Sequence, residues 1–153
     1  MGGNEVTPAA DVAQSGLLLL DTHALVWSVE ERPRLGSGAK RAINIAAQLN
    51  QIAVSAISPW EVALLVSKGR LNLSTDVMIW VRDVLSKPGV NLVPLEPEIA
   101  VASTRLPFEM HADPADRILV ATARHLGATL VTADQALLRL AKGGNFRGLD
   151  AAK

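Results

Sequence analysis

The sequence predicts a three-layer α/β fold in which helices flank a mostly parallel central sheet. Two observations predict this fold class. Short continuous apolar runs, suited to strands buried on both faces, lie at residues 17–20, 52–57, 91–96 and 128–132. Segments with apolar residues at helical spacing lie between or beside them, at 37–50, 58–69, 74–89 and 113–127. Strands that alternate with helices in this way are typical of parallel sheets covered by helices.

The four apolar runs differ in how well they suit a central strand. The first run, LLLL at 17–20, and the runs at 52–57 and 128–132 contain no proline. The run at 91–96 contains Pro94, whose nitrogen cannot donate a hydrogen bond to a neighbouring strand. We therefore expect this run to be the weakest candidate for the centre of the sheet.

The first two helical segments carry recognisable start signals. The segment 37–50 follows the sequence GSG, and Ser37 is its expected N-cap. The segment 58–69 begins with a capping box, in which Ser58 is the N-cap and Glu61 the third helical residue. Proline directly after Ser58 suits the first helical position, and a glycine at 69 suits the end of the helix.

The last two helical segments are also bounded. The segment 74–89 begins with a serine or threonine cap and is expected to stop at the Pro-Gly pair at 88–89. The segment 113–127 has Asp113 as its N-cap, Pro114 at the first helical position and Gly127 just past its end. Helices are further expected to start at Thr22 and Gln135 if the preceding aspartates act as caps.

Length and composition indicate one domain. A chain of 153 residues with 49% hydrophobic residues can build a single core. Residues 1–15 lack periodicity and predict a flexible tail, which leaves 16–150 for the domain.

The run at 17–20 is too short for a signal peptide or a membrane span, so we expect a cytoplasmic protein without a membrane partner. The absence of cysteine excludes disulfides and thiolate zinc sites. The zero net charge argues against strong non-specific nucleic-acid binding.

Four acidic residues occupy positions of one kind. Asp21 and Asp134 each end a predicted strand, while Glu61 and Asp116 each follow a cap-Pro-X sequence at a helix start. In parallel α/β sheets, sites form at the carboxyl ends of the strands, where the following helices begin. Carboxylates gathered there repel one another unless a cation is bound or protons are shared. Mg²⁺ or Mn²⁺ suits a site built from carboxylates.

Each of these acids also has an ordinary structural explanation. Glu61 could only close its capping box, and Asp21 and Asp134 could only cap helices. Asp116 could only stabilise the positive end of its helix. The metal hypothesis rests on all four acids together. It assigns Asp113 to the helix and Asp116, one turn further, to the metal.

Four stretches resemble the PIN-domain ribonucleases of the VapC-like toxin type. They are LLLLDTHALVW (17–27), SAISPWEVALLVSKGRLNL (55–73), DPADRILVATA (113–123) and LVTAD (130–134). The resemblance implies a PIN-like fold and a Mg²⁺-dependent endoribonuclease toxin. It also implies that a cognate antitoxin inhibits the toxin and that the toxin forms a homodimer.

The resemblance also implies roles for individual residues. The family's catalytic and metal-binding acids match Asp21, Glu61, Asp116 and Asp134. A hydroxyl near the metal matches Thr132, and Thr22 is expected to support the site from beside Asp21. Arg117 is expected either to orient a carboxylate or to meet a phosphate, or to be an ordinary surface arginine.

Histidine and tryptophan residues offer further candidates. His23 and His111 lie near acids, but we interpret both as surface or packing residues rather than ligands. Trp27, Trp60 and Trp80 could stack bases, although their apolar helical surroundings favour packing.

Two other functions remain open from the sequence. One is another Mg²⁺-dependent phosphoryl-transfer enzyme, such as a phosphatase, although His23 stands where a phosphoaspartyl enzyme needs a second aspartate. The other is a non-catalytic interaction module that keeps the fold. Loss of one or more acids would favour that module, and all four acids are present.

Overall fold

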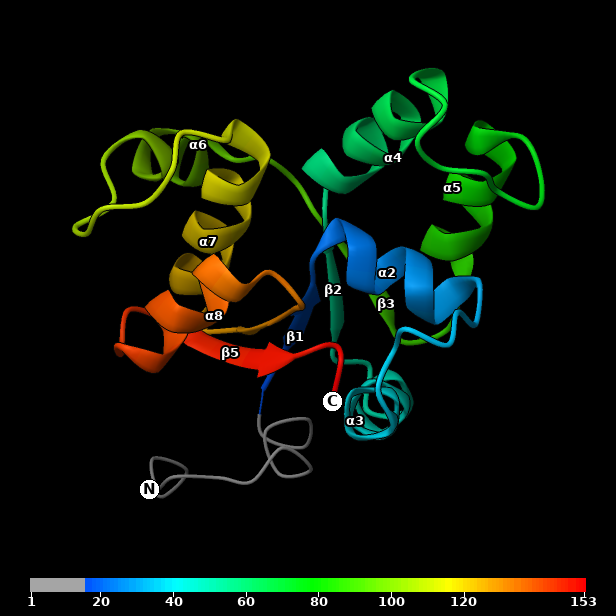
Figure 1. The fold of residues 1–153 in the computed structure, drawn as a ribbon, viewed down its shortest axis with the longest axis horizontal. Helices are drawn as coiled ribbons and strands as arrows, with labels where there is room; N and C mark the ends of the chain where they lie inside the picture. The colour runs from blue at the N-terminus through cyan, green and yellow to red at the C-terminus, as the bar shows by residue number, and fades with distance from the viewer. Residues whose placement is uncertain (1–15) are drawn as a thin grey trace.

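The sheet is fully parallel. The computed structural model describes residues 16–153, whose sheet has five strands, and Figure 1 shows the helices around this sheet. The strands are β1 (Leu18–Leu20), β2 (Ile52–Ser55), β3 (Val90–Val93), β4 (Thr129–Thr132) and β5 (Arg147–Asp150). Their spatial order is β3-β2-β1-β4-β5, and every neighbouring pair runs in parallel. The predicted fold class is confirmed.

Seven helices connect these strands within residues 16–153. They are α2 (Thr22–Val29), α3 (Ser37–Gln48), α4 (Ile57–Ser67), α5 (Val77–Ser86), α6 (Pro97–Thr104), α7 (Pro114–Leu126) and α8 (Gln135–Lys142). None of these described helices is both long and apolar enough to cross a membrane. The tail predicted at residues 1–15 lies outside the described residues.

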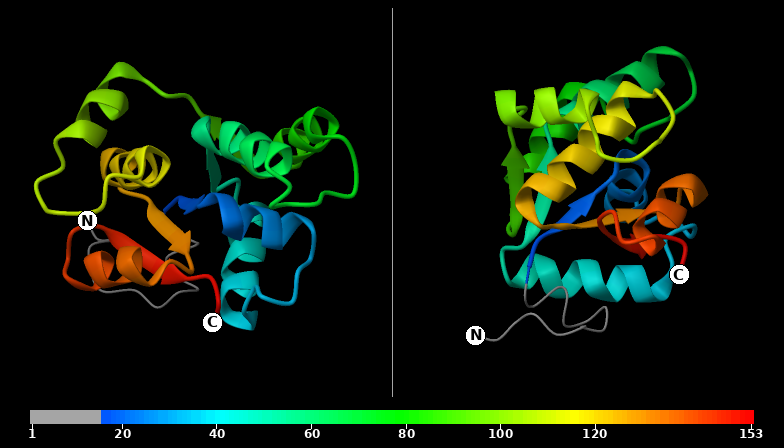
Figure 2. Two further views of the ribbon diagram at one scale, coloured as in Figure 1. Left: turned by 45° about the horizontal axis from the view of Figure 1, so that its top comes forward. Right: turned by 90° about the vertical axis from the view of Figure 1, so that its left-hand side faces the viewer.

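Successive side chains of each strand point to opposite faces of the sheet, as the two-residue period of a strand requires, and both faces are buried. Leu18, Leu20 and Val54 pack on one side with α2, α3 and α5. Leu19 and Leu130 pack on the other side with α7 and α8. Figure 2 shows helices on both sides of the sheet. The result is three layers, with the middle strands buried on both faces.

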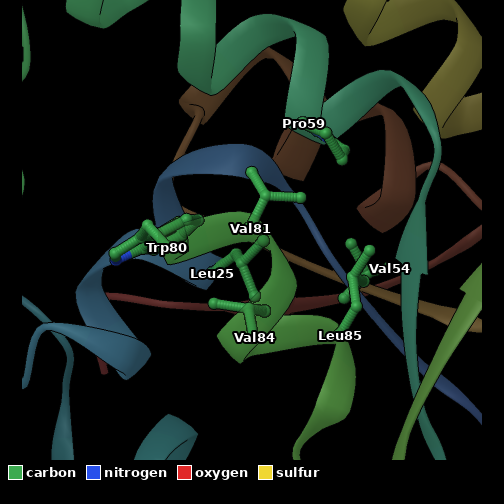
Figure 3. Close-up of a pocket in the computed structure, with 7 residues that line it drawn as sticks. All are labelled: Leu25, Val54, Pro59, Trp80, Val81, Val84 and Leu85. Atoms are coloured by element: carbon green, nitrogen blue, oxygen red, sulfur yellow. The ribbon is translucent and has the colours of Figure 1, made fainter. Parts of the chain in front are cut away.

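A small apolar pocket lies on the first side of the sheet. Figure 3 shows side chains from α2, β2, α4 and α5 around it. Its lining residues are Leu25, Val54, Pro59, Trp80, Val81, Val84 and Leu85. At about 10 Å³ it is no larger than one water molecule needs, and its lining is apolar. We interpret it as a packing gap rather than a ligand site.

The start of α4 differs from the predicted capping box. The helix begins at Ile57, and Ala56 stands at the N-cap position without a side-chain cap. The Ser55 hydroxyl accepts a hydrogen bond from the Ile57 backbone N–H at 3.1 Å, so an earlier serine supports the turn. The prediction that Ser58 caps this helix is therefore wrong. Ser58 is a fully buried helical residue instead.

Two further caps differ from the sequence expectation. At α5 the cap is Asp76, whose carboxylate accepts hydrogen bonds from the backbone N–H groups of the second and third helical residues. At α3 the cap position is Gly36 rather than Ser37. There the Gly38 backbone N–H donates to the Lys153 carbonyl at 2.8 Å, so a distant part of the chain satisfies this helix end.

The boundaries of α7 and β3 agree with the signals in the sequence. Asp113 is the N-cap of α7 and accepts from the Ala115 backbone N–H at 3.0 Å, as predicted. Gly127 ends this helix in the left-handed conformation. The strand β3 stops before Pro94 and lies at an edge of the sheet, which agrees with its expected weakness as a central strand. The sequence did not predict α6 or β5.

Candidate functional site

Four carboxylates meet at the carboxyl end of the sheet. Asp21 follows β1 and Asp134 follows β4, and these two strands are parallel neighbours. Glu61 lies in α4, directly after β2, and Asp116 lies in the first turn of α7. Helix α4 contacts both α2 and α7, and the three helices begin near the end of β1 (Figure 1). Charge interactions link Asp116 with the other three acids.

Asp21 is the most buried of these acids, with 8% of its surface exposed. Its carboxylate caps α2 by accepting a hydrogen bond from the Ala24 backbone N–H at 2.7 Å. Burial raises its pKa above the ordinary value, and hydrogen bonds from the Thr132 side chain and Ala24 oppose that shift. The structure therefore combines the capping role that the sequence left open with a place beside the other acids.

Thr132 connects two of the acids. It ends β4 and is fully buried. Its side chain hydrogen-bonds to the Asp21 carboxylate, and its hydroxyl oxygen accepts from the Asp134 backbone N–H at 3.1 Å. Asp134 itself caps α8 by accepting from the Leu137 backbone N–H at 3.0 Å. The expected position of Thr132 near the acids is therefore present in the structure.

Glu61 is held from α2 rather than by its own helix end. The Thr22 hydroxyl lies 2.5 Å from the Glu61 carboxylate and 3.1 Å from the Ser58 hydroxyl. Thr22 and Ser58 are both buried, whereas Glu61 is partly exposed. Thr22 was expected to support the site beside Asp21, and the residue that it contacts is Glu61.

At Asp116, burial and the neighbouring acids disfavour the charged form of the carboxyl group. Its pKa is raised to about 7, first by burial and then by the negative charges of Asp113, Glu61, Asp134 and Asp21. Its side chain is 20% exposed, so an incoming cation can reach it. A bound cation would relieve both the burial cost and the repulsion. The carboxylate oxygens around Asp116 are the ligands that hard divalent cations prefer.

Arg117 makes contacts that the sequence did not predict. Its guanidinium donates hydrogen bonds to the backbone carbonyls of Ser103, Met110 and His111, at 2.8, 3.2 and 3.3 Å. These bonds tie the end of α6 and the segment before α7 to the first turn of α7. In this structure the Arg117 guanidinium thus binds backbone carbonyls, and its contact with a phosphate stays a prediction.

His111 lies at the site, contrary to our interpretation of it as a surface or packing residue. Its Nε2 atom is 3.4 Å from the Asp116 carboxylate, and its Nδ1 atom accepts from the Asp113 backbone N–H at 3.4 Å. His111, Asp116 and Asp134 each place one potential ligand atom within 4.8 Å of the others. The one sequence signal was its place just before DPAD. His23 is exposed and packs edge-on against Trp27.

The tryptophans divide between core and surface. Trp27 and Trp80 are buried, and Trp80 donates its indole N–H to Glu30 at 3.0 Å. Trp60 is 55% exposed, although the helical pattern favoured packing for all three. The packing interpretation is thus correct for Trp27 and Trp80, which pack inside this chain.

Comparison with known proteins identifies the family of the chain. Residues 18–143 match the model of the PIN domain family. The chain belongs to this family. The PIN domain includes all four acids of the cluster and most of the described fold. The resemblance found in the four sequence motifs is confirmed.

Individual relatives of this PIN domain extend the comparison. The chain is 37% identical over 120 residues to Ribonuclease VapC22 of Mycobacterium tuberculosis, which covers 78% of this chain and 88% of that protein. A chain in the crystal structure of VapBC2 from Rickettsia felis, bound to a promoter DNA fragment, aligns with a TM-score of 0.61 at 18% identity, covering 87% and 97% of the two chains. A toxin–antitoxin complex from Klebsiella pneumoniae gives 0.58 at 21% identity, covering 88% and 97%. At these low identities the structures show a shared fold.

Proposed function

We propose that this PIN-domain protein is a Mg²⁺-dependent endoribonuclease toxin that hydrolyses RNA phosphodiester bonds. The observation that carries the proposal is the convergence of Asp21, Glu61, Asp116 and Asp134, with the pKa of Asp116 raised to about 7 by burial and by its acidic neighbours. Such a cluster favours the binding of a cation, because the cation stabilises carboxylates that would otherwise repel one another. The similarity to a protein named as a ribonuclease supports RNA as the substrate.

The residues present fit a divalent metal ion. Asp21, Glu61 and Asp116 would hold it, and Asp134 would assist directly or through water. When bound, such an ion lowers the pKa of a water molecule and stabilises negative charge on a phosphate, which is the chemistry that phosphodiester hydrolysis requires. Thr132 holds Asp21 relative to the start of α8, and Arg117 holds the segment that carries His111 near Asp116. The donor set suits Mg²⁺ and also accepts Mn²⁺.

A cognate antitoxin and a second copy of the chain are the proposed protein partners. Similarity to a chain from a toxin–antitoxin complex supports the first. Several large apolar side chains on α4 and α5 are about half exposed, namely Trp60, Met78 and Ile79. An apolar surface of this kind suits coverage by a partner. We also propose that the protein acts in the cytoplasm on its RNA substrate.

The decisive experiment is cleavage of single-stranded RNA by the purified protein. We expect cleavage with Mg²⁺ that stops in EDTA and returns when Mg²⁺ is added in excess. Cleavage that persists in EDTA would overturn the metal-dependent mechanism. Hydrolysis of a phosphate monoester without RNA cleavage would instead favour a phosphatase, and inactivity towards both substrates would favour an interaction module.

Growth of cells tests the toxin assignment separately. Expression of the wild-type chain alone should arrest growth, and co-expression with the adjacent small gene should restore growth. The Asp116→Asn variant provides the matched control, because it should be harmless without the neighbour. Equal toxicity of the wild type and this variant would show that RNA cleavage is not the cause.

A further inference from the structure

We propose that Ser58 and Thr22 form a buried hydroxyl chain that fixes the orientation of Glu61 in the metal site. Both are positioning residues in this proposal, since neither would touch the metal or the RNA. The inference rests on the proposed function, because it concerns the metal affinity of that same site. It also assigns a role to Ser58, which the sequence had placed at a helix cap.

The geometry of α4 brings two of the three groups to one face. Ser58 and Glu61 are three residues apart in this helix, so their side chains lie one above the other. Thr22, the first residue of α2, contacts both of them. The early start of α4 at Ile57 makes this possible, because it places Ser58 inside the helix rather than at its end. Residues far apart in sequence thus form one short chain.

The chemistry of the groups sets the direction of the hydrogen bonds. A hydroxyl has one proton to donate and can also accept, whereas an ionised carboxylate can only accept. Thr22 must therefore donate to Glu61, and Ser58 must donate to the Thr22 oxygen. Within the described residues, no buried side-chain nitrogen or oxygen lacks a hydrogen-bond partner. The Ser58 hydroxyl, which is fully buried, meets this requirement through Thr22.

This chain restricts a side chain that would otherwise be mobile. Glu61 is partly exposed, and a free glutamate samples many rotamers. A hydrogen bond from buried Thr22 holds one of its oxygens and leaves the other for a cation. Hydrogen-bonded partners of metal ligands typically change metal affinity or activity by about 10- to 100-fold when they are mutated. The proposal therefore predicts effects on metal binding that exceed effects on folding.

The experiment measures Mn²⁺ binding by the full chain, from the electron paramagnetic resonance signal of free Mn²⁺. We expect Thr22→Val to weaken binding about 10- to 100-fold, since the donor to Glu61 is lost. Ser58→Ala should weaken it about three- to tenfold, because Thr22 still donates but loses its own donor. Thr22→Ser keeps the hydroxyl and should bind Mn²⁺ within about threefold of the wild type.

Thr122→Val is the matched control. Thr122 is also buried, but its hydroxyl donates to the Ile118 carbonyl within its own helix at 2.7 Å. We expect this variant to bind Mn²⁺ like the wild type. With saturating metal, Thr22→Val should also lower kcat for RNA cleavage more than it changes KM, because Thr22 is proposed to act on the orientation of Glu61 and not on the RNA.

The outcomes separate this inference from the proposed function. Equal Mn²⁺ affinity of Thr22→Val and wild type would overturn the hydroxyl chain and leave the proposed function standing. Equal loss in Thr22→Val and Thr122→Val would also overturn it, by showing a general effect of removing buried hydroxyls. If wild type neither binds Mn²⁺ nor cleaves RNA, both proposals fail. If thermal melts show that Thr22→Val does not fold, Ser58→Ala decides, and unchanged affinity there overturns the chain.

Discussion

At the scale of single residues, position within one helical turn decides what a carboxylate does. Asp113 lies before the first turn of α7, is exposed and holds the Ala115 backbone N–H. Asp116 lies inside that turn, is largely buried and faces three other acids. The same side chain therefore acts as a helix cap at one position and as a candidate metal ligand three residues later.

The first prediction contrasts these two aspartates. Asp113→Asn should keep RNA cleavage within about threefold of the wild type, because asparagine also caps helices well. Asp116→Asn should keep the fold but lose at least about 100-fold in cleavage, since it removes a charged ligand. Cleavage rates at saturating Mg²⁺, with circular dichroism to confirm folding, test both. An inactive Asp113→Asn with an active Asp116→Asn would reverse the assignment.

The second prediction concerns the stability of the metal-free protein as a function of pH. Burial, followed by the neighbouring acids, raises the pKa of Asp116 from its ordinary value of 3.8 to about 7 in the folded state. Between these values the folded state binds more protons than the unfolded state. Stability from this group is therefore fully present below about pH 4 and is lost as the pH rises to about 7.

Removing that ionisation should remove this loss. In EDTA we expect the Asp116→Asn variant to melt a few degrees above wild type at pH 8, and the gap to shrink towards pH 5. For a domain of this size, about 1 kcal/mol corresponds to about 2–4 °C. Thermal melts at both pH values provide the measurement. A gap of constant size would mean that the cluster does not strain the folded state.

The acids and the neighbouring Thr22 and Thr132 could be predicted from the sequence, but the contacts that Ser58 and His111 make at the site could not. A strand end or a helix start is visible locally, and that was enough for Asp21, Glu61, Asp116 and Asp134. Ser58 meets Thr22 only because α4 and α2 pack together, since the two positions are 36 residues apart in the sequence. His111 reaches Asp116 because Arg117 holds the segment before α7. Contacts of this kind depend on tertiary structure, which no local signal encodes.

At the scale of helices and strands, elements with an apolar pattern or an N-cap aspartate were predicted, whereas α6 and β5 were missed. The helix at 113–127 and the central strands β1, β2 and β4 were found because their apolar patterns and boundaries agree. Helix α6 has only eight residues, although Pro97 and Glu98 in its first turn are start signals that could have revealed it. Strand β5 (RGLD) has no apolar run, and forms because β4 offers a parallel neighbour.

The third prediction belongs to this scale and concerns two glycines at element boundaries. Gly89 precedes β3 with φ +87°, and Gly127 ends α7 with φ +64°, so both occupy a conformation that other residues rarely adopt. A Cβ atom at Gly89 would lie 2.1 Å from the Ala47 carbonyl oxygen, whereas nothing lies within 4 Å of one at Gly127. Helix α3 therefore packs directly against the backbone at Gly89.

Alanine substitutions separate backbone strain from this collision. Gly127→Ala should cost about 1–2 kcal/mol, the usual penalty for a left-handed alanine. Gly89→Ala should cost more than about 3 kcal/mol, because the backbone of α3 or β3 must also move. Urea unfolding at equilibrium gives both values. If the two variants were equally destabilised, α3 would not be packed against β3 as closely as the structure has it.

At the scale of the whole molecule, the acidic cluster lies where several elements of the fold come together. Asp21 and Asp134 come from the ends of central strands, while Glu61 and Asp116 come from helices α4 and α7. These two helices contact each other, and Asp116 of α7 and Glu61 of α4 repel one another electrostatically. A cation at this point would therefore stabilise the molecule as a whole, since every ligand belongs to a different element.

The fourth prediction measures this effect as a melting temperature. A ligand that binds only the folded state at 100 times its Kd adds about 2.7 kcal/mol of stability. Millimolar Mg²⁺ should therefore raise the Tm of the wild type by about 5–10 °C at pH 8 if Kd lies in the ten-micromolar range. NaCl at equal ionic strength controls for screening of the acidic charges. Asp116→Asn should lose most of the Mg²⁺ shift while keeping its own higher starting Tm. An equal shift with NaCl would mean that salt only screens the four carboxylates and that they hold no ion. Specific binding differs from screening, because one bound ion would link side chains at the starts of α2, α4, α7 and α8.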